Sequence, residues 1–285
     1  MARISRCRRL LRAQRKQLWL RRHGASESVL TNAIKAWFAR LHKTALQRLD
    51  DGADAASLID VAAATDSLLA AAGPPMIQLA VGAAIEELAT HAVKTKAAKE
   101  IGVEFDEYDE DADDGIPESW LDEVPPAVLA AIQAEIGEAL KQPYWPELSE
   151  KTAADLQSKL TAAIESGRGL EAMIAAVKES LGPPTSDRRA RTIARTETTG
   201  ALNAGHHFAR VDLIEQGLIA GIEWLTVPDS DRRETHAALE GVIIGAAEKF
   251  NVGGYEAPFP GHWSMPARER VNCRCFTITF GTFAD

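Results

Sequence analysis

The stretch Gly221-Ile222-Glu223-Trp224-Leu225-Thr226-Val227 divides the chain into two kinds of sequence. In this stretch the apolar pattern changes to a period of two, which is typical of a β-strand, and Pro228 predicts the turn that ends it. The sequence before it is almost free of strand signals, whereas the sequence after it alternates short strands with turns. The pattern therefore predicts a mostly α protein, in which an all-helical N-terminal half is followed by a small α+β C-terminal domain.

The N-terminal half is rich in Ala, Leu, Glu, Lys and Gln, which are good helix formers. We expect helices at about residues 28–49, 53–72, 75–100, 125–141, 149–166 and 170–181. Gly73-Pro74-Pro75 should end one helix and begin the next, because proline lacks a backbone N–H and clashes with the preceding turn. These residues also interrupt the longest uncharged run, Ser67 to Ile85, so we expect two amphipathic helices there and no membrane span.

Gly182-Pro183-Pro184 predicts the boundary between the two halves. Beyond it, Ser186 or Asp187 can cap a long helix that runs to about Gln216 and ends at Gly217. After the strand at 222–227 we expect a short helix at 234–239, a loop at 251–266 and a final strand at 273–280. The predicted domains are a basic N-terminal arm (1–24), a helical domain (25–181) with an acidic loop (100–123), and an α+β domain (185–285).

The net charge of −9 hides a strong segregation of charge along the chain. Residues 100–123 contain twelve acids and no Lys or Arg. Residues 1–24 contain no acid and nine basic residues: Arg3, Arg6, Arg8, Arg9, Arg12, Arg15, Lys16, Arg21 and Arg22. If about half of these touched phosphate, log K for DNA would fall against log salt with a slope of about −4. The alternatives are docking on an acidic partner, with Leu11, Leu18 and Trp19 as anchors, and binding to a membrane surface.

The three cysteines, Cys7, Cys273 and Cys275, are too few for a disulfide framework and favour a reducing compartment. No continuous apolar segment follows the basic arm, so we expect no secretory signal.

An ordered set of short motifs occurs in the C-terminal third. It runs from Ala194-Arg195-Thr196-Glu197 through Trp224-Leu225-Thr226 and Asp231-Arg232-Arg233-Glu234-Thr235-His236, with Leu239 and Gly241, to Phe259-Pro260-Gly261 and Asn272-Cys273-Arg274-Cys275. Together these motifs resemble the phage Mu F-like family of head morphogenesis proteins over about residues 185–280. Many relatives carry His-Pro before the Asn, where this chain has Arg270 and Val271.

The resemblance implies a minor head protein of the virion, which associates with the portal and acts in head assembly and in DNA packaging or ejection. The implied partners are the portal protein, the major capsid or scaffolding protein, and packaged DNA through the basic arm, with no membrane. The implied location is the phage head, and the host cytoplasm during assembly. The motif residues would then be structural, with no catalytic residue and no cofactor other than a structural zinc.

The same residues leave a second reading open, that of a metal-dependent hydrolase or nuclease. His236, Cys273 and Cys275, with His262, are capable of binding zinc. The alternative is that the two cysteines are ordinary buried thiols packed with a hydrogen-bonded His236. Residues i and i+2 of a regular strand lie about 6.6 Å apart on one face, which is too far for two sulfurs on one zinc. A bend at residues 272–274 would be needed to bring the two cysteines together.

An enzyme would use His236 as general base, Asp231 or Glu197 as its orienting carboxylate, and Gly253-Gly254 as a substrate clamp. The alternative acid–base pair in an enzyme would be His206-His207. If these two histidines are only structural, we expect one imidazole to be solvated and the other to pack at an edge. Glu197 is also a candidate for an internal ion pair with Arg195 or Arg232.

Overall fold

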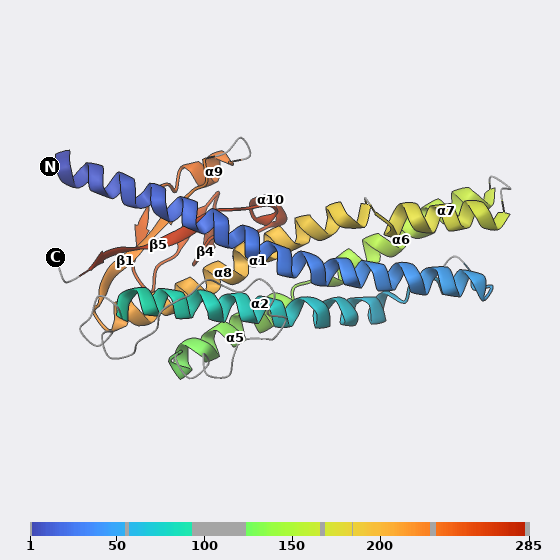
Figure 1. Ribbon diagram of the computed structural model, residues 1–285, viewed down its shortest axis with the longest axis horizontal. Helices are drawn as coiled ribbons and strands as arrows, with labels where there is room; N and C mark the ends of the chain where they lie inside the picture. Colours follow the sequence, from blue (N-terminus) through green and yellow to red (C-terminus); the bar gives the residue numbers. More distant parts are fainter. Residues whose placement is uncertain are drawn as a thin grey trace. The chain divides into compact units, whose positions relative to one another are not determined.

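A computed structural model describes residues 2–54, 57–92, 124–165, 169–183, 185–228 and 232–282. It is 69% helical, with small antiparallel sheets in the C-terminal part, which confirms the predicted fold class (Figure 1). The predicted acidic loop 100–123 and Asp231 lie outside the described residues.

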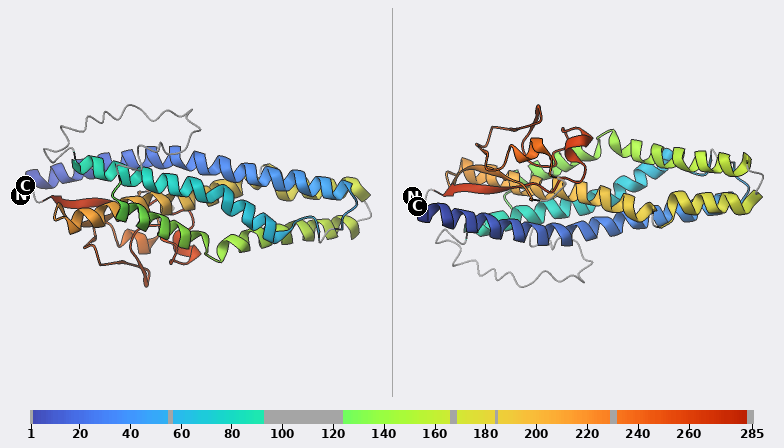
Figure 2. Two further views of the ribbon diagram at one scale, coloured as in Figure 1. Left: turned by 90° about the horizontal axis from the view of Figure 1, so that it is seen from below. Right: turned by 90° about the horizontal axis from the view of Figure 1, so that it is seen from above.

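Six helices of 13 or more residues form the helical part of the described chain. They are α1 (Ala2–Asp50), α2 (Val61–Ala92), α5 (Pro126–Leu140), α6 (Tyr144–Glu165), α7 (Gly169–Leu181) and α8 (Thr185–Glu215). α1 and α2 lie side by side (Figures 1 and 2), and the indole N–H of Trp37 donates to the carbonyl of Ala64 at 3.0 Å. The predicted bounds of the helices at 125–141 and 170–181 agree with α5 and α7 to within a residue.

Several helix predictions are wrong in extent; α6, for example, begins at Tyr144 and not at about residue 149. α1 begins at Ala2 and includes the whole basic arm, whereas the prediction began at Ser28. α2 continues through Pro74 and Pro75, where the prediction placed a turn. The residues on both sides of the prolines are fully buried, among them Leu68, Ala72 and Met76. Burial of this apolar face offsets the hydrogen bonds that the prolines remove, so tertiary packing overrides the local signal.

α2 is long and apolar enough to cross a membrane by length and composition. Of its most apolar window, however, 56% is buried inside the protein. This burial is what a core helix of a globular protein shows.

The C-terminal part contains five strands and two short helices within the described residues. β1 (Ile219–Leu225) lies between β2 (Ile243–Ile244) and β5 (Phe276–Thr282) in an antiparallel sheet. β3 (Phe250–Val252) and β4 (Tyr255–Ala257) form a hairpin, and the helices are α9 (Glu234–Ala237) and α10 (Ala267–Arg270).

Two local predictions in this part are corrected. Gly253 and Gly254, predicted within a loop or as a substrate clamp, have positive φ angles of 59° and 91° and form the turn of the β3–β4 hairpin. The final strand begins at Phe276 rather than at Cys273, because Asn272 adopts the left-handed conformation with φ 58° and turns the chain.

The chain divides into two compact units. The first consists of Met1–Ser26, Met76–Ile136 and Thr196–Asp285, and the second of Glu27–Pro75 and Gly137–Arg195. This division does not follow the predicted boundary at Gly182, because α1, α2, α5 and α8 each contribute residues to both units.

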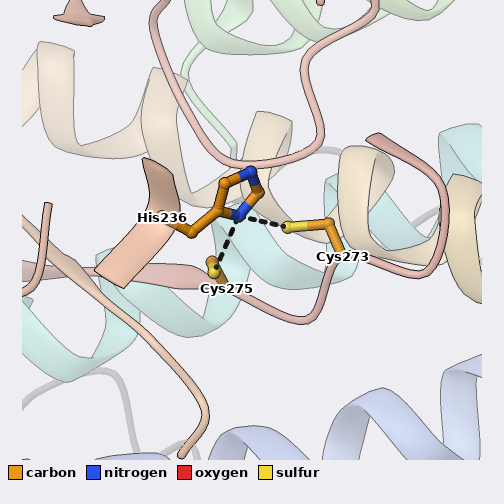
Figure 3. A group of neighbouring side chains, drawn as sticks. All are labelled: His236, Cys273 and Cys275. Carbon is orange, nitrogen blue, oxygen red and sulfur yellow. Dashed lines mark hydrogen bonds between the residues drawn. The ribbon is translucent and has the colours of Figure 1, made fainter. Parts of the chain in front are cut away.

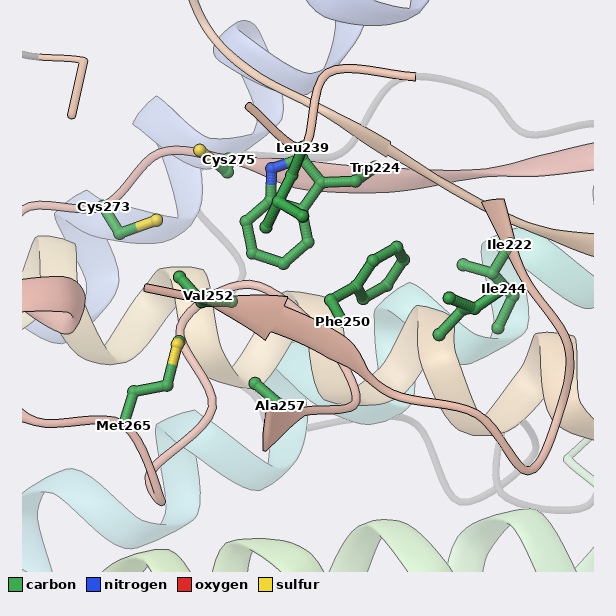
Figure 4. Close-up of a cluster of buried hydrophobic side chains, with 10 residues drawn as sticks. All are labelled: Ile222, Trp224, Leu239, Ile244, Phe250, Val252, Ala257, Met265, Cys273 and Cys275. Carbon is green, nitrogen blue, oxygen red and sulfur yellow. The ribbon is translucent and has the colours of Figure 1, made fainter. Parts of the chain in front are cut away.

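The first unit holds the sheet and a hydrophobic cluster beneath it (Figure 4). Its buried members are Ile222, Trp224, Leu239, Ile244, Phe250, Val252, Ala257, Met265, Cys273 and Cys275. Trp224 packs edge-to-face against Phe250, with ring centroids 5.0 Å apart. In the second unit, α6 packs on α7, and Trp145 is fully buried with its indole N–H donating to the carbonyl of Ala139.

Within the first unit, α8 passes very close to α2 at Gly205. A Cβ added there would lie 1.8 Å from the carbonyl oxygen of Ala80. We expect Gly205→Ala to lower the free energy of unfolding by roughly 1–3 kcal/mol, because the clash is with backbone and one helix must move. Gly82→Ala is the matched control, since its Cβ would meet nothing within 4 Å. It should raise stability by about 0.5–1 kcal/mol through helix propensity. Equal urea midpoints for the two variants would contradict the close approach.

Candidate functional site

His236, Cys273 and Cys275 come together in the first unit (Figure 3). The Nδ1 atom of His236 lies 3.4 Å from the sulfur of Cys275 and 3.6 Å from that of Cys273. All three side chains are buried, and their potential ligand atoms lie within 4.8 Å of one another. His236 comes from α9, and both cysteines come from the segment before β5. The structure thus brings together three of the four residues that the sequence offered as zinc ligands, and the bend that such a site required is present at Asn272.

Side chains of α1 and α8 hold the backbone of this bend in place. Three consecutive carbonyls each accept a hydrogen bond, that of Cys273 from Thr199 at 2.5 Å, that of Arg274 from the Trp19 indole at 3.0 Å, and that of Cys275 from the Asn203 amide at 3.0 Å. The buried carbonyls of this segment thus have hydrogen-bond partners without pairing to a neighbouring strand. This accounts for the late start of β5.

The Thr199 hydroxyl is part of a longer hydrogen-bonded chain. Because it gives its proton to the carbonyl of Cys273, it must accept from the Nε2 atom of His23, which lies 2.8 Å away. His23 comes from α1 and is itself buried. The first half of α1 is therefore part of the structure that supports the cluster.

The two thiols of the cluster differ in acidity. The hydrogen bond from Cys275 holds the pKa of the Cys273 thiol well below its ordinary value, with a further contribution from His236. The same hydrogen bond and burial raise the pKa of Cys275 well above its ordinary value. Cys273 is therefore the thiol that loses its proton first.

A carboxylate faces the other ring nitrogen of His236. The Oε2 atom of Glu269 lies 3.2 Å from His236 Nε2 and accepts a hydrogen bond from the Thr235 hydroxyl at 2.9 Å. A cavity of about 20 Å³ is lined by His236, both cysteines and neighbouring arginines. This volume suits a single water molecule and is far below the roughly 300–1,000 Å³ of a small-molecule site. The three side chains could hold a metal, and the cavity beside them is about the size of one water molecule.

Glu197, which ends the motif Ala194-Arg195-Thr196-Glu197, is fully buried. Its hydrogen-bond partners were not predicted from the sequence. Its two carboxylate oxygens accept from Arg270 at 2.6 Å and from the Trp263 indole at 2.8 Å. The predicted pairing with Arg195 or Arg232 is wrong. Side chains two residues apart on a helix do not face each other, and Arg195 pairs with Glu27 instead. Arg270 stands where relatives carry His, and it forms a buried ion pair with Glu197 here.

A second buried charge network is centred on Glu87 of α2 and was missed by the sequence analysis. Arg210 and the Thr279 hydroxyl each donate to Glu87 at 2.6 Å, and Arg210 also donates to Thr277 at 2.7 Å. His206 Nδ1 lies 3.2 Å from Glu87. The available signal was the pair Glu86-Glu87 at the end of an otherwise uncharged run. The sequence does not show which of these two carboxylates is buried.

The tandem histidines are both buried, which corrects the prediction that one is solvated. Burial lowers the pKa of His206, although the hydrogen bond to Glu87 opposes this shift. Burial and the positive charge of Arg210 lower the pKa of His207 to about 3. His207 packs between the rings of Phe208 and Phe259, at centroid distances of 5.3 and 5.4 Å. Both imidazoles are therefore neutral packing groups near pH 7.

The basic arm is engaged within the first unit. Arg12 pairs with Glu223, Lys16 with Glu240 at 2.7 Å, and Arg22 with Glu86. Trp19 is buried and stacks on Phe276 at a centroid distance of 5.1 Å. Burial lowers the pKa of Arg15, and the nearby Glu87 opposes this shift, whereas Arg21 is exposed. One prediction was that the arm docks as a helix on an acidic partner. The arm does contact acidic residues as a helix, but these residues belong to the same chain.

The remaining predicted site residues either contact neighbouring protein groups or have side chains outside the described residues. Arg232 donates to the Thr226 hydroxyl at 3.3 Å, Gly241 has a positive φ of 83°, and Arg274 lines the small cavity. His262 lies 3.0 Å from Glu135 and is not part of the His–Cys cluster. The side chains of Arg3, Arg6, Arg8 and Arg9 lie outside the described residues.

Comparison with known proteins confirms the resemblance. Residues 154–278 match the family described as Phage Mu protein F like protein, which indicates a phage head-related protein. This match begins in α6 and covers the buried motif residues described above.

Two curated proteins are similar to parts of the chain. The uncharacterized protein YqbB of Bacillus subtilis (strain 168) is 26% identical over 191 residues, which cover 60% of this chain and 60% of that protein. The NAD(+)–arginine ADP-ribosyltransferase EFV of Enterococcus faecalis (strain ATCC 700802 / V583) is 33% identical over 93 residues, 33% of this chain and 19% of that protein. The chain thus spans 60% or less of these relatives. No solved structure shows a significant match.

The Glu197–Arg270 pair gives a stability prediction. We expect Arg270→Met to lower the free energy of unfolding by about 3–5 kcal/mol, because it leaves a buried carboxylate without its ion-pair partner. Arg268→Met, on the same short helix, is the control, since that side chain is 66% exposed. It should change stability by less than about 1 kcal/mol. Urea unfolding measures both, and a loss at position 270 no larger than that at 268 would show that the pair contributes little.

The buried histidines give a pH prediction. The folded protein resists protonation of His207 until about pH 3, whereas the unfolded chain binds that proton at about pH 6.5. Stability should therefore fall as pH drops below about 6.5, by up to about 1.4 kcal/mol per pH unit for this group. We expect His207→Gln to show a shallower loss between about pH 6 and 4, measured by urea midpoints. Parallel pH profiles for the two proteins would mean that His207 does not titrate differently on unfolding.

Proposed function

From the Phage Mu protein F like region at residues 154–278, we propose that this chain is a minor head protein of a phage virion. It associates with the portal and acts in head assembly and in DNA packaging or ejection. The observation that carries the proposal is the family match together with the place of the motif residues. Five residues of the set, Glu197, Trp224, His236, Cys273 and Cys275, are buried in the interior of the first unit.

The burial of these residues supports a structural role. Glu197, Trp224, His236 and Cys273 are each at most 2% exposed, and polar side-chain atoms of Glu197 and His236 contact other protein groups. A catalytic group must reach its substrate, whereas a residue that holds two segments together can be wholly covered. This pattern supports a protein that acts through its surface, by assembly contacts.

Partners of such a protein would include the portal protein and the major capsid or scaffolding protein. DNA contact through α1 would draw on fewer charges than the sequence suggested. Arg12, Lys16 and Arg22 already form ion pairs within the first unit, so a slope against salt shallower than about −4 is expected. This favours protein contacts over DNA contacts as the main assembly role.

The alternative of a metal-dependent hydrolase has no supporting observation beyond the ligand set. The cavity at His236, Cys273 and Cys275 has about 20 Å³, much less than the volume of a typical small-molecule site. ADP-ribosyl transfer to arginine is stated in the name of one relative, and the match covers 19% of that protein. We therefore do not extend that activity to this chain.

The proposal is tested in the phage that encodes the chain. We expect purified DNA-filled virions to contain the full-length chain at a much lower copy number than the major capsid protein, as measured by quantitative mass spectrometry. Coexpression of the tagged full chain with the portal protein should retain the portal on the affinity resin, with the major capsid protein as control bait. Absence of the chain from both virions and empty heads would contradict a head protein, and equal retention of both baits would contradict specific portal association.

A further inference from the structure

We propose that His236, Cys273 and Cys275 bind a zinc ion, through Nδ1 of the histidine and the two Sγ atoms. Tetrahedral zinc with bonds of about 2.0–2.1 Å to nitrogen and about 2.3 Å to sulfur places N and S about 3.5 Å apart. The two N–S distances here are 3.4 and 3.6 Å. Both N–S distances therefore match tetrahedral zinc coordination, and all three ligand atoms lie within 4.8 Å of one another (Figure 3).

The surroundings of His236 orient the ring for metal binding. The carboxylate of Glu269, 3.2 Å from Nε2, favours the proton on that nitrogen and leaves the lone pair of Nδ1 directed at the two sulfurs. Zinc-bound histidines usually have a carboxylate or carbonyl beside the ring nitrogen that does not bind the metal. The Thr235 hydroxyl, which donates to Glu269, holds this carboxylate in position.

The cysteines are held by groups that do not depend on a metal. Thr199, Trp19 and Asn203 bind the carbonyls of residues 273–275, so the two sulfurs stay on one side of the bend. Little rearrangement is then needed on binding, which favours affinity. The metal would tie α9 to the segment that leads into β5.

The charge of the site also suits a divalent ion. Two thiolates and a neutral imidazole cancel the charge of Zn²⁺, so the buried site is neutral when loaded. Each thiol that is protonated before binding releases its proton to solvent. The cavity of about 20 Å³ beside the three ligands has room for a water molecule as the fourth ligand.

The experiment uses the reduced full-length chain and the metals alone. We expect about one zinc ion per chain by elemental analysis after expression with added zinc. Cobalt(II) added to the zinc-free protein should give a thiolate-to-metal charge-transfer band and intense visible bands of tetrahedral coordination. Free thiols with neither zinc nor a cobalt spectrum would overturn the proposal, and so would a Cys273–Cys275 disulfide that persists in freshly reduced protein without metal.

Variants then assign the ligands. Cys273→Ser, Cys275→Ser and His236→Gln should each lose most of the bound zinc. His262→Gln is the matched control, because this imidazole contacts Glu135 and is outside the cluster, and it should keep the zinc. Retention of zinc by all three ligand variants, or equal loss in the control, would overturn the assignment. If a ligand variant fails to fold, two measurements on the wild-type protein decide whether the site binds metal: the cobalt spectrum, and the fall in Tm when a chelator removes the metal. This test is independent of portal binding, so its failure leaves the proposed function standing.

Discussion

Three consecutive backbone carbonyls, those of Cys273, Arg274 and Cys275, accept hydrogen bonds from side chains of α8 and α1. A buried carbonyl without a partner costs free energy comparable to a lost hydrogen bond. These three contacts therefore determine where the segment lies, where β5 begins and on which side the two sulfurs emerge. They also draw the first half of α1 into the first unit, because the donor to Arg274 is Trp19.

Buried charges make the packing around this segment specific. Glu197 with Arg270, and Glu87 with Arg210, are charge pairs with less than a tenth of either side chain exposed. A buried ion pair adds little net stability, but removing one partner is costly because the other charge stays buried. Each pair also recruits a neutral donor, Trp263 for Glu197 and Thr279 for Glu87. The pairs thus link α8 to the C-terminal segments and to α2, and any other register would leave a charge unpaired.

The predictions that succeeded rest on local signals, and those that failed rest on contacts far apart in sequence. The bounds of α5 and α7 follow from helix formers between clear breakers, and the end of α8 follows from Gly217, which has a φ of 71°. The predicted cap at Ser186 or Asp187 is wrong, because α8 begins at Thr185 and includes both residues. Gly73-Pro74-Pro75 is an equally clear local signal, yet α2 continues through it because its flanking residues are buried. The β3–β4 hairpin was missed because its strands have three residues each, too short for a periodicity to emerge.

The sequence by itself determined the fold class, the resemblance of residues 154–278 to the Phage Mu protein F like family and the identity of the three potential metal ligands. Composition, helix-breaking residues and motif order can be read from short segments of the chain. Predictions based on them therefore need no knowledge of contacts between distant residues. Only the tertiary structure decided the partners of the charges: that Glu197 pairs with Arg270, and that the basic helix meets acids of the same chain. Ion pairs form between residues up to 224 positions apart, so no spacing along the chain encodes them. They depend on which surfaces the burial of apolar side chains brings together.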